Sequence, residues 1–170
     1  EELNKRYIPN FLPKDDEGYI TLCTHNYQAK NINDEKLKSI KNPSFFFKAT
    51  VKDEFYESSY PNDFELELKK DAQVMFVKND YSSDATKRRY YNGKIGKIVD
   101  IDKDKIIVRC IGEENDIEVS RYVWNNYKYE INNNTKAIEE KVIGTFEQYP
   151  LKLAWAITIH KSQGLTFDKV

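Results

Sequence analysis

The chain has 170 residues, of which 39% are hydrophobic and 32% charged, and its formal net charge is −1. This composition is typical of a folded globular protein and excludes a long disordered chain. No apolar run is long enough to cross a bilayer, and the near-neutral charge excludes a protein that coats nucleic acid by bulk positive charge.

The two cysteines, Cys23 and Cys110, lie far apart, each within an apolar run. Their spacing matches no zinc motif, so we expect buried free thiols in a reducing compartment and no metal site. The start of the chain, EELNKRYIPN, lacks the apolar core of a signal peptide. We therefore predict a cytoplasmic protein without a membrane partner.

The first elements along the chain predict a strand, a tight turn and a helix. Residues 1–16, which contain two prolines, indicate a lead-in or linker. Residues 19–23 form a short β-rich run, and apolar side chains fall on one face of a helix over 27–40. Thr24 or Asn26 can cap the start of this helix. A strand, turn and helix are the unit of an open α/β sheet.

From Ser44 onward the hydrophobic pattern alternates with a period of two. The sequence predicts strands over 44–51, 64–68, 72–77, 94–101, 105–111, 116–124, 127–131 and 140–149. Turn signals such as Asn92–Gly93 separate them. Short strands at close spacing predict a small β-barrel or sandwich, here inserted into the α/β part.

A basic segment lies inside this β-rich region. From Asp84 to Cys110 there are eight Lys or Arg residues against four Asp, a local net charge of +4. Arg88 and Arg89 precede two tyrosines; guanidinium groups pair with phosphates, and tyrosines stack on bases. The cluster is a candidate DNA-binding hairpin, and an ordinary solvated face explains the charges equally well.

The last segment, from Pro150 to Val170, is the most informative. An apolar run over 151–159 predicts a packed core segment, and polar or small residues follow at its end. These residues are Thr158, His160, Lys161, Ser162, Gln163 and Gly164. Hydroxyl and imidazole groups can donate hydrogen bonds to phosphate oxygens, and the lysine adds positive charge. A polar turn after a buried segment is the simpler alternative.

Three strings resemble motifs of superfamily 1 helicases in the RecD-like and Pif-type branch. AWAITIHKSQGLTF matches a motif of the second motor domain nearly residue for residue, and TLCTHNYQAKNINDEKL is similar to another. The string LKKDAQVMF, followed by an Asn–Gly turn, resembles the start of an SH3-like barrel inserted in that domain. Asp71 stands where this family usually has glycine. The resemblance covers roughly Tyr19 to Val170.

The resemblance implies a role for each motif residue. Gln163 and Gly164 would lie toward the ATP cleft and sense the nucleotide. The basic hairpin would add Arg88 and Arg89 to the DNA contacts. The remaining residues expected to contact the backbone of single-stranded DNA are Thr24, Asn26, Thr158, His160, Lys161 and Ser162.

The implied fold is α/β plus all-β. An incomplete second RecA-like motor domain would comprise residues 17–70 and 147–170, and an SH3-like β-barrel would occupy residues 71–146. The first RecA-like motor domain of the same parent chain would be its partner, together with single-stranded DNA.

The implied activity is that of an ATP-dependent helicase that moves 5′ to 3′ on DNA, with ATP and Mg²⁺ as cofactors. The chain contains no G-x-x-x-x-G-K-[ST] loop, so we expect this part alone to bind no cofactor, to hold no catalytic residue and not to hydrolyse ATP. The alternative is a non-enzymatic SH3-like module for nucleic acid or protein. A small hydrolase that uses His160 lacks a nucleophile elbow or a carboxylate pair.

Overall fold

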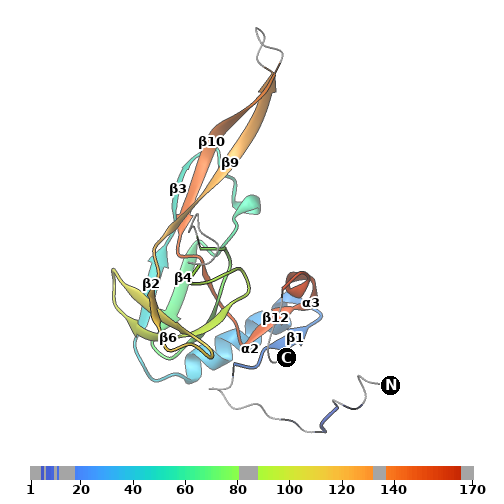
Figure 1. Ribbon diagram of the computed structural model, residues 1–170, viewed down its shortest axis with the longest axis vertical. Coiled ribbons are helices and arrows are strands. Elements are labelled where there is room, and N and C mark those ends of the chain that lie inside the picture. Colours follow the sequence, from blue (N-terminus) through green and yellow to red (C-terminus); the bar gives the residue numbers. More distant parts are fainter. Residues whose placement is uncertain are drawn as a thin grey trace.

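The computed structural model describes residues 5, 7–9, 11, 18–80, 88–131 and 137–165. They form a mixed α/β fold made mostly of strands, with a long ribbon-like arm that extends from one end of the molecule (Figure 1). No helix among these residues is long and apolar enough to span a membrane.

The two ends of the described chain meet in one small parallel sheet. Strand β1 (Thr21–Cys23) pairs with β12 (Ala156–Thr158), and Figure 1 shows this early strand and this late strand side by side. Helix α2 (Asn26–Ser39) follows β1, and the short α3 (Ile159–Ser162) follows β12. The predicted strand and helix are confirmed.

The cap of α2 differs from the prediction, because His25 and not Thr24 or Asn26 occupies the N-cap. The backbone N–H of His25 donates to Oε1 of Gln28 at 3.3 Å, so the glutamine reaches back from the third helical position. Oγ1 of Thr24 lies 2.8 Å from Nδ1 of His25. Thr24 is one residue too early to cap the helix, and Asn26 is already its first residue.

The described strands between α2 and β12 form three antiparallel sheets. The largest has the order β11 (Leu151–Leu153), β5 (Gln73–Phe76), β6 (Ile95–Ile101), β7 (Ile106–Cys110) and β8 (Asp116–Glu118). In the described part of the chain its outer strands, β11 and β8, do not pair with each other. We call it the five-stranded sheet.

Two smaller sheets complete the fold. Strand β2 (Ser44–Lys48) pairs with β4 (Glu65–Lys69), and β3 (Thr50–Asp53) pairs with β10 (Ile138–Gln148), which also pairs with β9 (Tyr122–Ile131). A 3₁₀ turn (Glu57–Ser59) lies between β3 and β4. The predicted strand 44–51 is split at Ala49, where the chain passes from one sheet to the next. Strands β9 and β10 extend beyond β3 as the arm in Figure 1.

The largest of four hydrophobic clusters among the described residues connects the helix with the strands. Leu37 of α2 packs in the same cluster as Leu68, Phe76, Ile98 and Leu151, and the last four side chains are fully buried. Because large apolar side chains from α2 and from the five-stranded sheet are buried together, the sheet is positioned firmly against the α/β part.

Asp71 adopts the backbone geometry that explains the usual glycine at its position. Its φ is +73°, in the left-handed region that glycine occupies without strain and that aspartate tolerates better than most residues. Its carboxylate accepts a hydrogen bond from Nδ2 of Asn42 at 2.9 Å and lies 3.2 Å from Nζ of Lys97. These two contacts offset part of the backbone strain.

Candidate nucleic-acid interface

Two polar segments lie together where the parallel strands end. Because β1 and β12 run in the same direction and Cys23 pairs with Thr158, the segments that follow them leave the sheet at the same edge. We call this edge, comprising residues 24–26 and 158–164, the carboxyl edge. In open α/β sheets, ligands bind at the carboxyl ends of parallel strands. The edge therefore brings together most of the residues predicted from the two motifs.

The polar groups of the carboxyl edge differ in how available they are. Side chains of His160, Lys161 and Gln163 are exposed, and Lys161 forms no ion pair with the residues that the structure describes. Ser162 is half-buried, and its hydroxyl donates to the carbonyl of Ile159 at 2.7 Å. The serine can therefore accept a ligand hydrogen bond, but its own proton is already used.

Thr158 does not reach outward from the core as its place at the end of an apolar run suggests. It is only 5% exposed, because the strand β12 continues through it and the first exposed residue is Ile159. Its side chain lines a cavity of about 540 Å³, together with Asn26 and Lys161. A phosphate could approach Thr158 only through this cavity.

A half-buried lysine lines the same cavity. Burial lowers the pKa of the Lys152 ammonium, nearby Asp63 acts in the opposite direction, and Lys161 lowers it further. Three lysines (Lys30, Lys152 and Lys161) and four carboxylates (Asp34, Asp63, Glu65 and Glu67) line the cavity, so positive and negative charges are mixed in it.

An amide side chain holds β12 against the helix, and sequence reasoning missed it. Asn33 Nδ2 donates to the carbonyl of Ala156 at 2.9 Å, while its Oδ1 accepts from the backbone N–H of Trp155 at 3.0 Å and of Ala156 at 2.9 Å. Asn33 lies four residues after Ala29 and four before Leu37, both buried. A polar residue on the apolar stripe of a helix was the signal that could have identified it.

The carboxyl edge ends in a tight turn. Gln163 has φ −61° and ψ 129°, Gly164 has φ +77°, and the N–H of Leu165 donates to the carbonyl of Ser162 at 3.0 Å. These values match a type II β-turn, which requires a positive φ at its third residue. The glycine is therefore needed for the turn, and the turn presents Gln163 to solvent.

The basic-aromatic hairpin does not have the open arrangement that its sequence suggests. Arg89 is bound by Asp80 in a bidentate pair, with Nε–Oδ2 and Nη2–Oδ1 distances of 2.8 and 3.0 Å. Tyr90 is buried and stacks on Phe76 at 3.9 Å between ring centroids. Arg88 is exposed and forms no ion pair within the described ranges. One arginine of the two predicted is therefore open to a phosphate.

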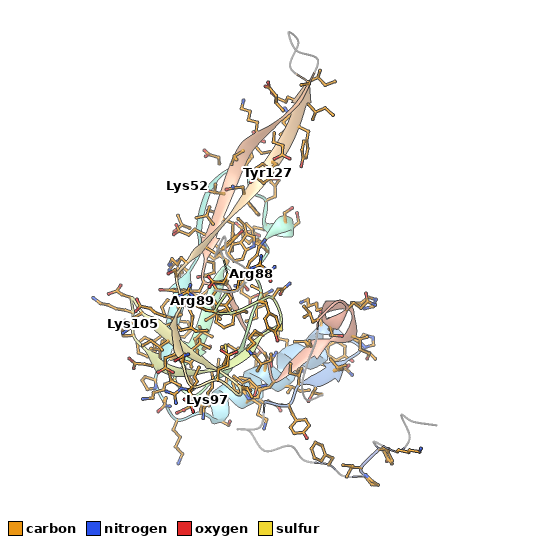
Figure 2. The ribbon with its side chains drawn as sticks, in the orientation of Figure 1. Lys52, Arg88, Arg89, Lys97, Lys105 and Tyr127 are labelled. Atoms are coloured by element: carbon orange, nitrogen blue, oxygen red, sulfur yellow. The ribbon has the colours of Figure 1, made fainter. Side chains whose placement is uncertain are left out.

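Four further cations of the basic segment also have acidic partners. Figure 2 labels Lys97 and Lys105, with Arg88 and Arg89, over the β-rich body of the molecule. The paired cations, with their N–O distances, are Lys94 with Glu113 (2.6 Å), Lys97 with Asp71 (3.2 Å), Lys103 with Asp104 (3.7 Å) and Arg109 with Asp116 (2.7 Å). We call these residues, with Arg89 and its partner Asp80, the paired basic face.

The described residues contain no candidate metal site, and the thiol of Cys110 is not reactive. The described ranges contain no group of three or more His, Cys, Asp or Glu residues placed to hold a metal ion. Cys23 and Cys110 are buried free cysteines. Burial raises the pKa of the Cys110 thiol to about 11, which keeps it protonated and unreactive at neutral pH.

Comparison with known proteins identifies relatives along nearly the whole chain, although no family model matches it. The ATP-dependent DNA helicase Pif1 of Campylobacter jejuni is 33% identical over 91% of this chain. The unliganded structure of Pif1 from Bacteroides has a TM-score of 0.81 at 40% identity over 92% of the chain. Pif1 from Bacteroides in complex with ADP-AlF3 and ssDNA has a TM-score of 0.71 at 40% identity over 99%.

The chain is much shorter than these relatives. It covers 36% of the Campylobacter protein and 34% of the unliganded Bacteroides chain. The similarity thus concerns about a third of a Pif1 helicase.

Proposed function

Because the chain belongs to the Pif-type branch of superfamily 1 helicases, we propose that it is the part of a DNA motor that grips single-stranded DNA. The carboxyl edge of β1 and β12 is the gripping surface. The observation that supports this most strongly is the parallel pairing of Cys23 with Thr158, which joins two motifs more than 130 residues apart at one edge. A Bacteroides relative was crystallised with ssDNA and a nucleotide analogue, in agreement with such a role.

The fold is consistent with a motor domain that carries an insertion. We propose that β1, α2, β12 and α3 belong to an incomplete second RecA-like domain, covering about residues 17–70 and 147–170. The five-stranded sheet belongs to an SH3-like barrel inserted at about 71–146. The parallel β1–β12 pair supports this division, because strands adjacent in a parallel sheet are normally joined by a crossover, and here the crossover includes the whole β-rich region.

Each residue of the carboxyl edge has a distinct task in this proposal. His160 and Lys161 contact phosphates directly, because they are exposed. Asn26 and Thr158 contact a phosphate that enters the cavity, and Ser162 accepts rather than donates. Thr24, whose hydroxyl lies near His25 and Gln28, adds a contact at the rim. Gln163 and Gly164 respond to nucleotide through the exposed turn.

The parent protein is then an ATP-dependent 5′-to-3′ DNA helicase. Its first RecA-like domain would supply the phosphate loop and the ligands for Mg²⁺, since the described residues offer no metal cluster and the sequence no such loop. The buried free cysteines support a reducing, cytoplasmic location.

The alternative, an isolated SH3-like interaction module, is less well supported. A module of this kind needs only the antiparallel strands, whereas the described chain also forms a parallel βα unit whose polar edge has no role in a barrel. The β1–β12 pair is three residues long in each strand, and a pair this short indicates part of a larger sheet.

Phosphate release with saturating oligo(dT) tests the proposal. The full-length parent protein should hydrolyse ATP in a DNA-dependent manner, and the 170-residue chain should not. DNA-independent hydrolysis by the parent, or turnover by the chain that follows the protein through two purification columns, would contradict this division of labour.

A further inference from the structure

Leu165 connects the end of the carboxyl edge with the five-stranded sheet, beside Ile157 of β12, which lies in the same hydrophobic cluster. Leu165 is the last residue of the turn that presents Gln163, and its N–H closes that turn at 3.0 Å from the carbonyl of Ser162. Its side chain packs on a small hydrophobic cluster that contains Met75 of β5 and is also contacted by Ile95 of β6. The end of the turn is therefore held by residues of the five-stranded sheet.

The absence of a side chain at Gly93 makes room for this leucine. A methyl group added at Gly93 would lie 3.1 Å from Cδ2 and 3.3 Å from Cβ of Leu165, closer than normal van der Waals contact. Gly93 has φ +96°, and its N–H donates to the carbonyl of Phe76 at 2.8 Å. Because Phe76 is fully buried in β5, the surface that receives Leu165 belongs to the rigid part of the sheet.

The turn thus has two fixed ends. Its first end, Ser162, belongs to α3, which continues directly from β12. Its second end, Leu165, lies against Gly93. Between them Gln163 and Gly164 are exposed, and a Cβ added at Gly164 would meet no described atom within 4 Å. A movement of Gly93 relative to α3 would therefore change the orientation of the turn.

We infer that Leu165, packed against Gly93, is a positioning residue through which the five-stranded sheet sets the orientation of the Gln163–Gly164 turn. This inference rests on the proposed nucleotide-sensing role of that turn. It assigns the inserted sheet a part in the response to ATP that is separate from any contact with DNA. The residue acts through the turn and does not itself touch nucleotide.

A matched pair of glycine substitutions isolates the contact. Gly93→Ala places a methyl group against Leu165, whereas Gly112→Ala places one at φ +79° with no atom within 4 Å. Both substitutions strain the backbone in the left-handed region, so their difference reports the contact with Leu165 alone. Leu165→Ala removes the other side of the contact, and Leu165→Met retains most of its length.

Hydrogen exchange at the Leu165 amide in the full-length protein measures the turn directly. Gly93→Ala and Leu165→Ala should each accelerate this exchange about tenfold, while Gly112→Ala and Leu165→Met leave it near the parent rate. The double variant Gly93→Ala/Leu165→Ala should be no faster than either single variant, because both changes act on the same contact and alanine at position 165 keeps only the Cβ near the added methyl. Additive effects, or an equal effect of Gly112→Ala, would overturn the inference.

ATPase activity at saturating DNA separates this inference from the function on which it rests. Gln163→Ala, which should lower kcat, is the reference. We expect Gly93→Ala and Leu165→Ala to lower kcat as well, by about three- to tenfold, and Leu165→Met to keep kcat near the parent value. If Gln163→Ala has no effect, the sensing role of the turn is wrong, and the inference that rests on it fails as well. If Gln163→Ala lowers kcat while Gly93→Ala behaves as Gly112→Ala, the positioning role is overturned and the sensing role stands.

Discussion

The carboxyl edge and the paired basic face both carry cations but differ in what these cations contact. On the paired basic face, Arg89, Lys94, Lys97 and Arg109 each lie within 3.2 Å of a carboxylate oxygen. At the carboxyl edge, Lys161 has no carboxylate partner among the described residues. A cation already paired with a carboxylate gains less from a phosphate, because binding first breaks the existing pair. The number of positive charges is therefore a poorer guide to a DNA site than their pairing.

This difference limits what the local charge of +4 says about DNA binding. The window from Asp84 to Cys110 omits the carboxylates that neutralise it, which come from Asp71, Asp80, Glu113 and Asp116. Neighbouring strands and turns place these carboxylates beside the cations of the basic segment. A count along the chain misses them, because strand pairing determines the neighbours of each side chain.

The largest expected effect concerns the support of the carboxyl edge. Asn33→Ala removes three hydrogen bonds to Trp155 and Ala156 and leaves their backbone groups without partners. We expect a loss of about 2–4 kcal/mol in the free energy of unfolding. Asn31→Ala, an exposed substitution in the same helix, is the control and should change stability by about 0.5 kcal/mol or less. Urea denaturation of both variants measures the difference, and equal losses would contradict the assigned role of Asn33.

The next largest effect should come from substitutions that remove phosphate contacts at the carboxyl edge. In the full-length protein, His160→Ala and Lys161→Ala should each raise the DNA concentration required for half-maximal ATPase by about ten- to a hundredfold, because each removes a phosphate contact worth about 1–3 kcal/mol. Lys97→Ala on the paired basic face is the matched control and should have less than about a twofold effect. A titration with oligo(dT) distinguishes the two regions, and similar shifts for Lys97 and Lys161 would remove the distinction.

Substitutions in the basic-aromatic hairpin should have a smaller effect, but they distinguish its two arginines from each other. Arg88→Ala should reduce the slope of log affinity against log salt by about 1, since one phosphate contact is lost. Arg89→Ala should leave that slope nearly unchanged, because its guanidinium is held by Asp80. Binding of fluorescent oligo(dT) at several salt concentrations measures both slopes. An equal decrease for Arg89→Ala would mean that this arginine exchanges Asp80 for DNA.

The smallest expected effect is the pH dependence of Lys152. Its pKa is lowered from 10.5 in the folded state, so the unfolded chain binds the proton more tightly, and the burial of the charge destabilises the fold below the folded-state pKa. Lys152→Met should therefore be more stable than the parent at pH 7. This advantage should shrink as the pH rises through the lowered pKa toward 10.5. Thermal melts across this range check the trend, and a constant difference would rule out the titration.

Much of the fold was accessible from sequence, because its strands alternate strongly and its helix has a clear apolar stripe. The strands over 94–101 and 105–111 were placed to within one residue of β6 and β7 at each end. The carboxyl edge was accessible only through its motif strings. The burial of Thr158 and the joining role of Asn33 were not predicted, since both depend on the packing of β12 against α2 and not on local pattern.

Lysine acetylation of the full-length protein, with and without oligo(dT) and read residue by residue by mass spectrometry, tests the central claim most directly. One experiment compares the cations of both regions in the same molecule. The account predicts that DNA protects Lys161 and leaves the paired lysines Lys94, Lys97 and Lys103 as reactive as before. Protection of the lysines on the body of the molecule with no change at Lys161 would contradict it, and would place the DNA on the five-stranded sheet instead.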